Sequence, residues 1–233
     1  MSVVLGIDTA TADAAAALTR DGESIAERLV PPGPDGRPRH SRALLGEIED
    51  VVAAGGGWDA VDLIGVGIGP GSYTGLRIGI ATARASAQSL GKPIAGVSSL
   101  AALARGIGEL PEAAGRPRLP LIDARRGQLF AALRGDDGEE IWPPFVASPE
   151  ELAARIAELA QIPLAAGDGA IRFQDGLEAV GVTVSPSGDP VHRIAARHIC
   201  ALAEALAPKR PEQIEPLYLR APDAEVWLER DRP

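Results

Sequence analysis

The sequence predicts an α/β protein in which one β-β-β-α-β-α unit occurs twice, giving mixed sheets covered by helices. Residues 5–9 and 120–124 each read as a short apolar strand that ends in an aspartate and one further residue. A second strand and an Asp-Gly turn follow each run, at residues 21–22 and 137–138, and this dipeptide is a strong hairpin signal. The aspartates Asp8 and Asp123 lie 115 residues apart, and the turn glycines Gly22 and Gly138 lie 116 apart. The two units therefore keep a common spacing.

Each unit continues past its hairpin with a third strand, over residues 24–30 and 140–146, and then with a helix. Ser148 and Glu151 mark the start of the second helix as a capping box, with proline at the first helical position. The first helix begins near His40 or Ser41 and keeps its apolar residues on one face. A strand ending in glycines and a further helix follow in both units. We expect an N-terminal half over residues 1–108, a C-terminal half over 109–207 and an extended tail over 208–233.

Residues 66–83 read VGIGPGSYTGLRIGIATA, a strand that enters a Gly-Pro turn and then a helix beginning near Ser72 or Thr74. Small residues recur every fourth position of this helix, so they form one smooth stripe. The stripe consists of Gly75, Gly79, Ala83 and Ala87. Glycine inside a helix costs about 1 kcal/mol relative to alanine, and close approach of another backbone would offset that cost. The stripe therefore predicts a contact surface.

Composition excludes several classes of protein. The 233 residues contain no run of eighteen apolar residues, so no membrane span is expected, and the N-terminus enters a strand without a basic signal-peptide region. The single cysteine, Cys200, cannot form an internal disulfide, which fits a reducing cytoplasm. A net charge of −9 argues against an autonomous nucleic-acid binder. Five arginines cluster in the second unit, and a solvated rim of a strand pair is favoured over an RNA groove; they are Arg116, Arg118, Arg125, Arg126 and Arg134.

Six segments in order resemble the TsaB family, also called YeaZ. They are IDTAT at residues 7–11, HS at 40–41 with LL at 44–45, GPGSYTGLR at 69–77, VSSL at 97–100, IDAR at 122–125 and PLYLR at 216–220. The resemblance covers nearly the whole chain, and the block at residues 69–77 is its most specific part. It implies the actin-like, ATPase-type fold of sugar kinases, with two related halves.

The resemblance also implies a function. Family members are cytoplasmic, non-catalytic scaffold or dimerization subunits of the bacterial machinery that makes N6-threonylcarbamoyladenosine (t6A) in tRNA. The partner TsaD performs the transfer, the ATPase subunit TsaE joins them, and tRNA is reached only through the complex. A homodimer is the alternative pairing. The expected partner interface comprises His40, Leu44, Leu45, Ile48, Gly75, Leu76, Gly79 and Ala83.

Enzymatic alternatives are tested by their own residue patterns. A metal held by His-x-x-x-His is not expected, because Leu44 stands four residues after His40, and His192 and His198 are six residues apart. Ser72 is expected to cap a helix and not to act as a protease nucleophile. We therefore expect no catalytic residue, no metal and no required cofactor.

Nucleotide binding stays open, because strand-end aspartates face the phosphates in actin-like folds. Weak or vestigial binding of ATP or ADP would use Asp8, Thr9, Thr11, Asp123, Gly167, Asp168 and Gly169. However, Ala-Arg-Arg follows Asp123 where such folds carry a glycine-threonine phosphate loop. The alternatives to a scaffold are a kinase-like ATPase that uses Asp8 and Asp123, and a partner of a ribosomal-protein acetyltransferase.

Overall fold

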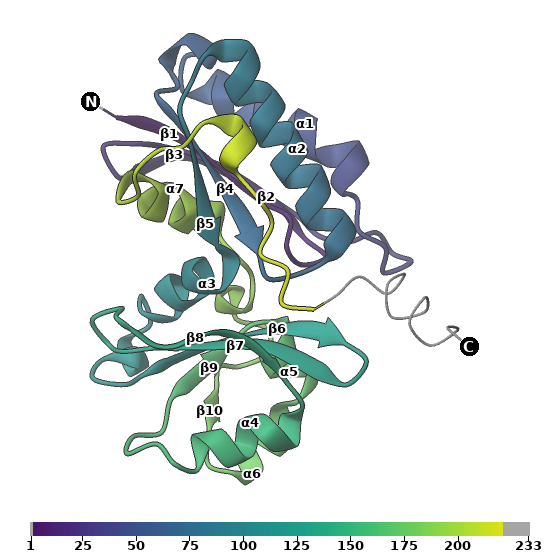
Figure 1. The fold of residues 1–233 in the computed structure, drawn as a ribbon, viewed down its shortest axis with the longest axis vertical. Helices are drawn as coiled ribbons and strands as arrows, with labels where there is room; N and C mark the ends of the chain where they lie inside the picture. The colour runs from purple at the N-terminus through teal and green to yellow at the C-terminus, as the bar shows by residue number, and fades with distance from the viewer. Residues whose placement is uncertain (1, 221–233) are drawn as a thin grey trace.

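The computed structural model describes residues 2–220 and arranges them as two five-stranded sheets, one above the other in Figure 1, with helices between and around them. The first sheet has the strand order β3-β2-β1-β4-β5 and the second the order β10-β9-β6-β7-β8. In each sheet, three antiparallel strands are extended by two parallel ones. The sheets are mixed, as the sequence predicts, because each unit starts with hairpins and continues through helical crossovers.

The strands of the first sheet are β1 (Val3–Asp8), β2 (Ala14–Arg20), β3 (Glu23–Val30), β4 (Leu63–Gly69) and β5 (Ile94–Ser98). Those of the second are β6 (Arg118–Arg125), β7 (Gln128–Arg134), β8 (Glu140–Ala147), β9 (Leu164–Ala166) and β10 (Thr183–Val184). The helices are α1 (His40–Ala54), α2 (Tyr73–Leu90), α3 (Ser99–Ile107), α4 (Pro149–Ile156), α5 (Asp168–Arg172), α6 (Gln174–Ala179) and α7 (Ala196–Glu204). Single 3₁₀ turns are η1 (Trp58–Ala60), η2 (Pro111–Ala113), η3 (Pro190–His192) and η4 (Pro211–Gln213).

Two helices cross between the halves. Helix α3, which follows β5 in the chain, packs on β6 and β9 of the second sheet, whereas α7, which follows β10, packs on β1, β2 and β4 of the first. The two helices also contact each other, in the layer between the sheets in Figure 1. Each sheet is therefore partly covered by a helix that follows the strands of the other sheet in the chain.

Helix α7 approaches the first sheet closely because glycine occupies the strand positions beneath it. A Cβ atom on Gly6 would lie 2.5 Å from the carbonyl oxygen of Ala196 and 2.6 Å from the Sγ of Cys200. A Cβ on Gly65 would lie 2.7 Å from that of Ala203. Burial at this contact raises the pKa of the Cys200 thiol to about 12, so the thiol stays protonated. The low aromatic content of the chain is compatible with a tight core because backbone and small side chains fill it.

The small-residue stripe of α2 faces β1 of its own half. The N-cap residue Ser72 accepts a hydrogen bond from the Gly75 amide, 3.3 Å away. A Cβ on Gly75 would lie 2.2 Å from the Thr9 carbonyl oxygen, and one on Gly79 would lie 2.2 Å from Thr9 Oγ1. Thr9 Oγ1 also donates to the Gly75 carbonyl at 2.8 Å, and Ala83 is fully buried. The prediction that this stripe contacts another protein is wrong, because its own strand end already fills the space.

Alternation along β1 sends its last side chains to opposite faces of the sheet. Thr9 faces α2, whereas Asp8 faces α3, where it accepts hydrogen bonds from the hydroxyl of Ser99 (2.6 Å) and the amide of Ala10 (2.8 Å). Gly67 makes room for this carboxyl group, because a Cβ there would lie 1.9 Å from Asp8 Oδ2. Burial raises the pKa of Asp8 to about 6, and the two hydrogen bonds oppose that rise.

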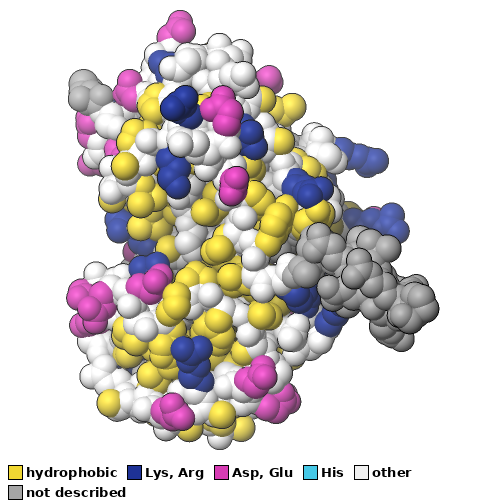
Figure 2. Space-filling view, in the orientation of Figure 1, with side chains coloured by type: hydrophobic (Ala, Val, Ile, Leu, Met, Phe, Trp, Pro, Cys, Tyr) yellow, Lys and Arg dark blue, Asp and Glu magenta, His cyan; other side chains and the backbone are white. Residues whose placement is uncertain are grey.

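Charge is unevenly spread on the face shown in Figure 2. Acidic and basic side chains are interspersed over the upper half, while several basic ones lie along the right flank beside the junction of the halves. Within residues 2–220, no helix combines the length and the apolar character needed to cross a bilayer.

Replacing Gly75 with alanine should lower the free energy of unfolding by about 1–2 kcal/mol, because overpacking against the Thr9 backbone outweighs the gain in helix propensity. The matched control is Gly46→Ala in α1, where nothing lies within 4 Å of the added Cβ. That change should raise stability by up to about 1 kcal/mol. Urea unfolding curves measure both variants, and a stabilised Gly75→Ala variant would contradict the packing described here.

The pKa of Asp8 predicts a pH-dependent contribution to stability. The folded protein binds a proton at Asp8 more tightly than the unfolded chain, for which the ordinary value is 3.8. This contribution is therefore complete below pH 4 and is lost as the pH rises through about 6, a change of about 3 kcal/mol. The variant Asp8→Asn lacks the titration, so its stability relative to the natural protein should improve between pH 4 and pH 7.5. Urea unfolding across that range measures the difference, and a difference independent of pH would disprove the assignment.

Candidate functional site

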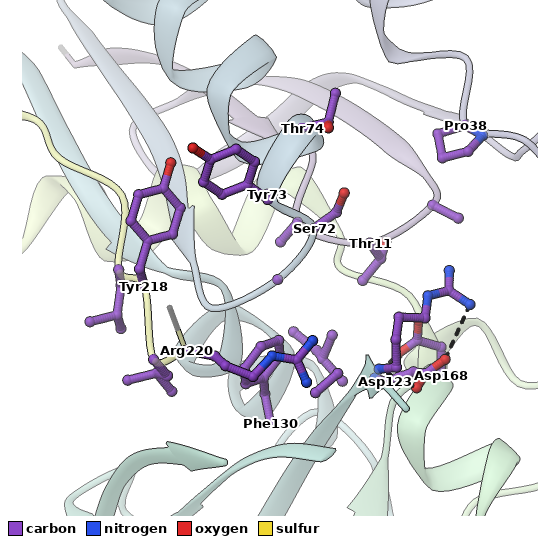
Figure 3. Close-up of a pocket in the computed structure, with 18 of the residues that line it drawn as sticks. Thr11, Pro38, Ser72, Tyr73, Thr74, Asp123, Phe130, Asp168, Tyr218 and Arg220 are labelled. Carbon is purple, nitrogen blue, oxygen red and sulfur yellow. Dashed lines mark hydrogen bonds and ion pairs between the residues drawn. The ribbon is translucent and has the colours of Figure 1, made fainter. Parts of the chain in front are cut away.

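A cavity of about 510 Å³ lies where the two halves meet. The loop after β1, the start of α2, the β6–β7 hairpin and the segment after η4 form its walls (Figure 3). Segments distant in sequence therefore converge on one cleft, and both halves contribute to it.

The structure brings only part of the expected nucleotide-binding set to this cleft. Thr11, Asp123 and Asp168 line it, whereas Asp8 and Thr9 are buried on the two faces of the first sheet. The two glycines that flank Asp168 pack against β6 and β7 and do not line the cavity. A Cβ on Gly167 would lie 1.9 Å from the Leu121 carbonyl oxygen, and one on Gly169 would lie 2.7 Å from Leu129 Cδ2. The expectation that Asp8 and Asp123 face one ligand is therefore wrong, because strand alternation turns Asp8 toward α3.

The two carboxyl groups in the cleft already have partners. Asp123 Oδ2 lies 2.7 Å from the Arg172 guanidinium and 3.3 Å from that of Arg125, and its Oδ1 accepts from the Arg125 amide at 2.8 Å. Asp168 accepts from the amide of Asp123 at 2.9 Å, and burial raises its pKa. A cation would have to displace these arginines from Asp123. Among residues 2–220, no group of three or more His, Cys, Asp and Glu side chains is placed to hold a metal ion.

The three histidines bind backbone groups or lie in the core. His40 Nε2 is 3.0 Å from the carbonyl oxygen of Asp13, and burial lowers the pKa of this imidazole. His192 Nδ1 is 3.1 Å from the Gly167 amide and its Nε2 is 3.0 Å from the Ser185 carbonyl oxygen. Burial lowers the pKa of His198 to about 4, so it is neutral at pH 7.

The arginine cluster predicted in the second unit separates into two groups. Arg116 donates to the carbonyl oxygens of Ile162 and Pro163, both at 3.2 Å, and Arg118 and Arg134 donate to carbonyl oxygens of the β7–β8 turn. These three support loops at the far end of the second sheet. Only Arg125 and Arg126, at the tip of the β6–β7 hairpin, reach the cleft.

The residues that complete the cleft have no predicted role from the sequence. The segment after η4 crosses from the first half to the second. The Leu217 amide donates to the carbonyl of Ile68 at 2.7 Å, and Arg220 donates to Gln128 Oε1 at 2.9 Å. Tyr218 stacks on Tyr73 with ring centroids 5.1 Å apart (Figure 3). The PLYLR motif at residues 216–220 was the available signal, but nothing in the sequence places it beside α2.

The expected partner interface is mostly internal. His40, Leu44, Ile48 and Leu76 are buried, as are the small residues of the α2 stripe that belong to the expected interface, Gly75, Gly79 and Ala83. Leu45 is the exception, since 62% of it is exposed. It lies on the side of α1 that faces solvent, next to the exposed Gly46, and α1 packs beside α2 in Figure 1. We call the exposed residues Leu45, Gly46, Ala81 and Ala85 the outer face of α1–α2.

Comparison with known proteins agrees with this architecture. The family model described as "TsaD: tRNA N6-adenosine threonylcarbamoyltransferase" matches residues 35–226. The chain is 30% identical to the tRNA threonylcarbamoyladenosine biosynthesis protein TsaB of Escherichia coli, over 93% of this chain and 94% of that protein. It is 33% identical to an uncharacterized protein of Mycobacterium leprae, over 96% of this chain, and spans only 56% of that protein's length.

Solved structures support the same assignment. YeaZ from Pseudomonas aeruginosa superposes with a TM-score of 0.78 at 27% identity, over 94% of this chain and all of that chain. The ROK hexokinase of Thermus thermophilus gives a TM-score of 0.50 at 14% identity, over 87% of this chain and 98% of that chain, which is a likeness of fold alone. The predicted actin-like α/β fold and the predicted family are confirmed. The chain belongs to the TsaB (YeaZ) family and carries a TsaD-family domain over residues 35–226.

Proposed function

We propose that this chain is a cytoplasmic, non-catalytic scaffold subunit of the bacterial machinery that makes t6A in tRNA. The observation that carries the proposal is its similarity to TsaB proteins along nearly their full length, since the E. coli relative is named for t6A biosynthesis. The state of the cleft supports the non-catalytic role. Asp8 is buried beneath Ser99, and Asp123 is held by two arginines, so neither is free to bind the cation of a nucleotide.

The scaffold pairs with TsaD through the outer face of α1–α2, and TsaE joins the pair. Leu45 is the most exposed of the large hydrophobic side chains within residues 2–220. The exposed Gly46 on α1 and the exposed Ala81 and Ala85 on α2 leave both helix backbones open to close approach, which favours packing of partner helices. A second copy of this chain would compete for the same face. The matching fold of the TsaD family, whose model covers residues 35–226, supports a partner built from similar helices.

Replacing Leu45 with glutamate should weaken pairing with TsaD from the same bacterium at least about tenfold, because a central apolar anchor commonly contributes more than about 1 kcal/mol. The matched control is Ile162→Glu, since Ile162 is 51% exposed and lies in the other half of the chain. Isothermal titration calorimetry measures both variants, and circular dichroism checks that each is folded.

The control should bind TsaD like the natural protein. Equal weakening in both variants would indicate a general effect of added negative charge. If Leu45→Glu binds with unchanged affinity, the pairing surface lies elsewhere.

A further inference from the structure

We propose that the mouth of the cleft is an RNA-binding surface, which contacts phosphates and an unpaired base of the tRNA that the complex handles. That the RNA is this tRNA rests on the proposed function, whereas the RNA-binding character of the surface follows from the residues that form it. We call this surface the cleft rim; it consists of Tyr73, Arg77, Arg125, Arg126, Tyr218 and Arg220.

The rim carries positive charge on an acidic protein. The residues that line the cleft include three arginines, Arg125, Arg126 and Arg220, and two aspartates, Asp123 and Asp168. Two further arginines are bound to the lining residues: Arg77 to Tyr218 at 3.2 Å and Arg172 to Asp123 at 2.7 Å. Among the lining residues, arginines outnumber carboxylates three to two, and Arg77 and Arg172 add positive charge beside them, in a chain whose net charge is −9. Such a local excess attracts phosphate groups even where the whole protein repels them.

The hairpin tip presents two of these cations to solvent. Arg125 and Arg126 adopt left-handed backbone conformations, with φ values of 62° and 53°. The Arg125 side chain is 70% exposed although it pairs with Asp123. In contrast, Arg116, Arg118 and Arg134 donate to carbonyl groups of loops at the other end of the second sheet. Arg125 and Arg126 are both exposed at the cleft, so an external phosphate can reach them.

Aromatic rings occupy the other end of the rim. Tyr73 and Tyr218 are 38% and 40% exposed, and their rings are tilted by 30° with centroids 5.1 Å apart. The Arg77 guanidinium lies 4.0 Å from the centroid of the Tyr73 ring. Figure 3 shows the two tyrosines at one side of the cavity and Asp123 with Asp168 at the other. Single-stranded RNA is recognised by this combination, because bases stack on aromatic and guanidinium planes while arginines contact the backbone.

The contacts within the rim also fix its shape before RNA arrives. Tyr218 is held by Arg77 and Tyr73 of the first half, while Arg220 is held by Gln128 of the second. Stacking surfaces that are already ordered lose little conformational entropy when they bind.

The test measures binding of the full chain to a short, fluorescein-labelled, single-stranded RNA of mixed sequence by fluorescence anisotropy at low ionic strength. The double variant Arg125→Asn/Arg126→Asn removes two charges and keeps residues that tolerate left-handed backbone. It should bind about tenfold more weakly and lower the magnitude of the salt slope by about 1.4, the value for two lost phosphate contacts on a single strand. Tyr218→Ala should also weaken binding about tenfold but leave the salt slope unchanged.

The matched control is Arg28→Gln/Arg105→Gln, which removes the same charge at two residues that do not line the cleft. It should bind RNA like the natural protein, and thermal melting checks that all variants fold. Three results would overturn the proposal: no binding by the natural chain, equal loss in the control, or displacement of RNA by equimolar ATP, which would indicate a mononucleotide site.

Pairing with TsaD is measured on the same variants by co-elution and should be unchanged. The two proposals therefore fail separately. If the natural protein pairs with TsaD but does not bind RNA, only the rim proposal is contradicted. If it binds RNA but does not pair with TsaD, only the scaffold proposal is contradicted.

Discussion

Close contact between helices and glycine-faced strands is the constraint on which the rest of the structure depends. Gly6 and Gly65 let α7 lie directly on one face of the first sheet. On its other face, the glycines of α2 leave room for Thr9. Helix α7 also contacts α3, which packs on the second sheet. These two helices therefore fix the position of one sheet relative to the other. The cleft between the halves is thus shaped by contacts on the first sheet that are made at backbone distance.

The same packing determines which chemical groups the cleft presents. Strand alternation turns Asp8 away from the cavity, and the arginines around Asp123 neutralise the corresponding aspartate of the second unit. Within residues 2–220, the polar lining of the cleft therefore combines Asp123 and Asp168 with arginine, tyrosine and hydroxyl groups, and Asp8 is not part of it. An actin-like framework can in this way keep its cleft while the chemistry inside it changes.

Helix α2 connects the three features that matter for function. Its inner side is filled by Thr9 and His40 and so belongs to the core. Its outer side contributes Ala81 and Ala85 to the proposed pairing face, and its first turns supply Tyr73 and Arg77 to the rim. A surface for a protein partner and a surface for RNA can therefore be carried on one rigid element, which keeps their geometry fixed relative to each other.

The sequence by itself determined the duplicated α/β plan, the capping box at Ser148 and the family, because strand periodicity, turn residues and motifs are local signals. It also identified the glycine stripe of α2 as a place of close approach, which is correct, but not which backbone approaches it. That choice belonged to the tertiary structure, as did the inward turn of Asp8, the pairing of Asp123 with Arg172 and the meeting of Tyr73 with Tyr218. Tyr73 and Tyr218 stand 145 positions apart, and a local pattern carries no information about which distant residue will lie within contact distance once the helices have packed.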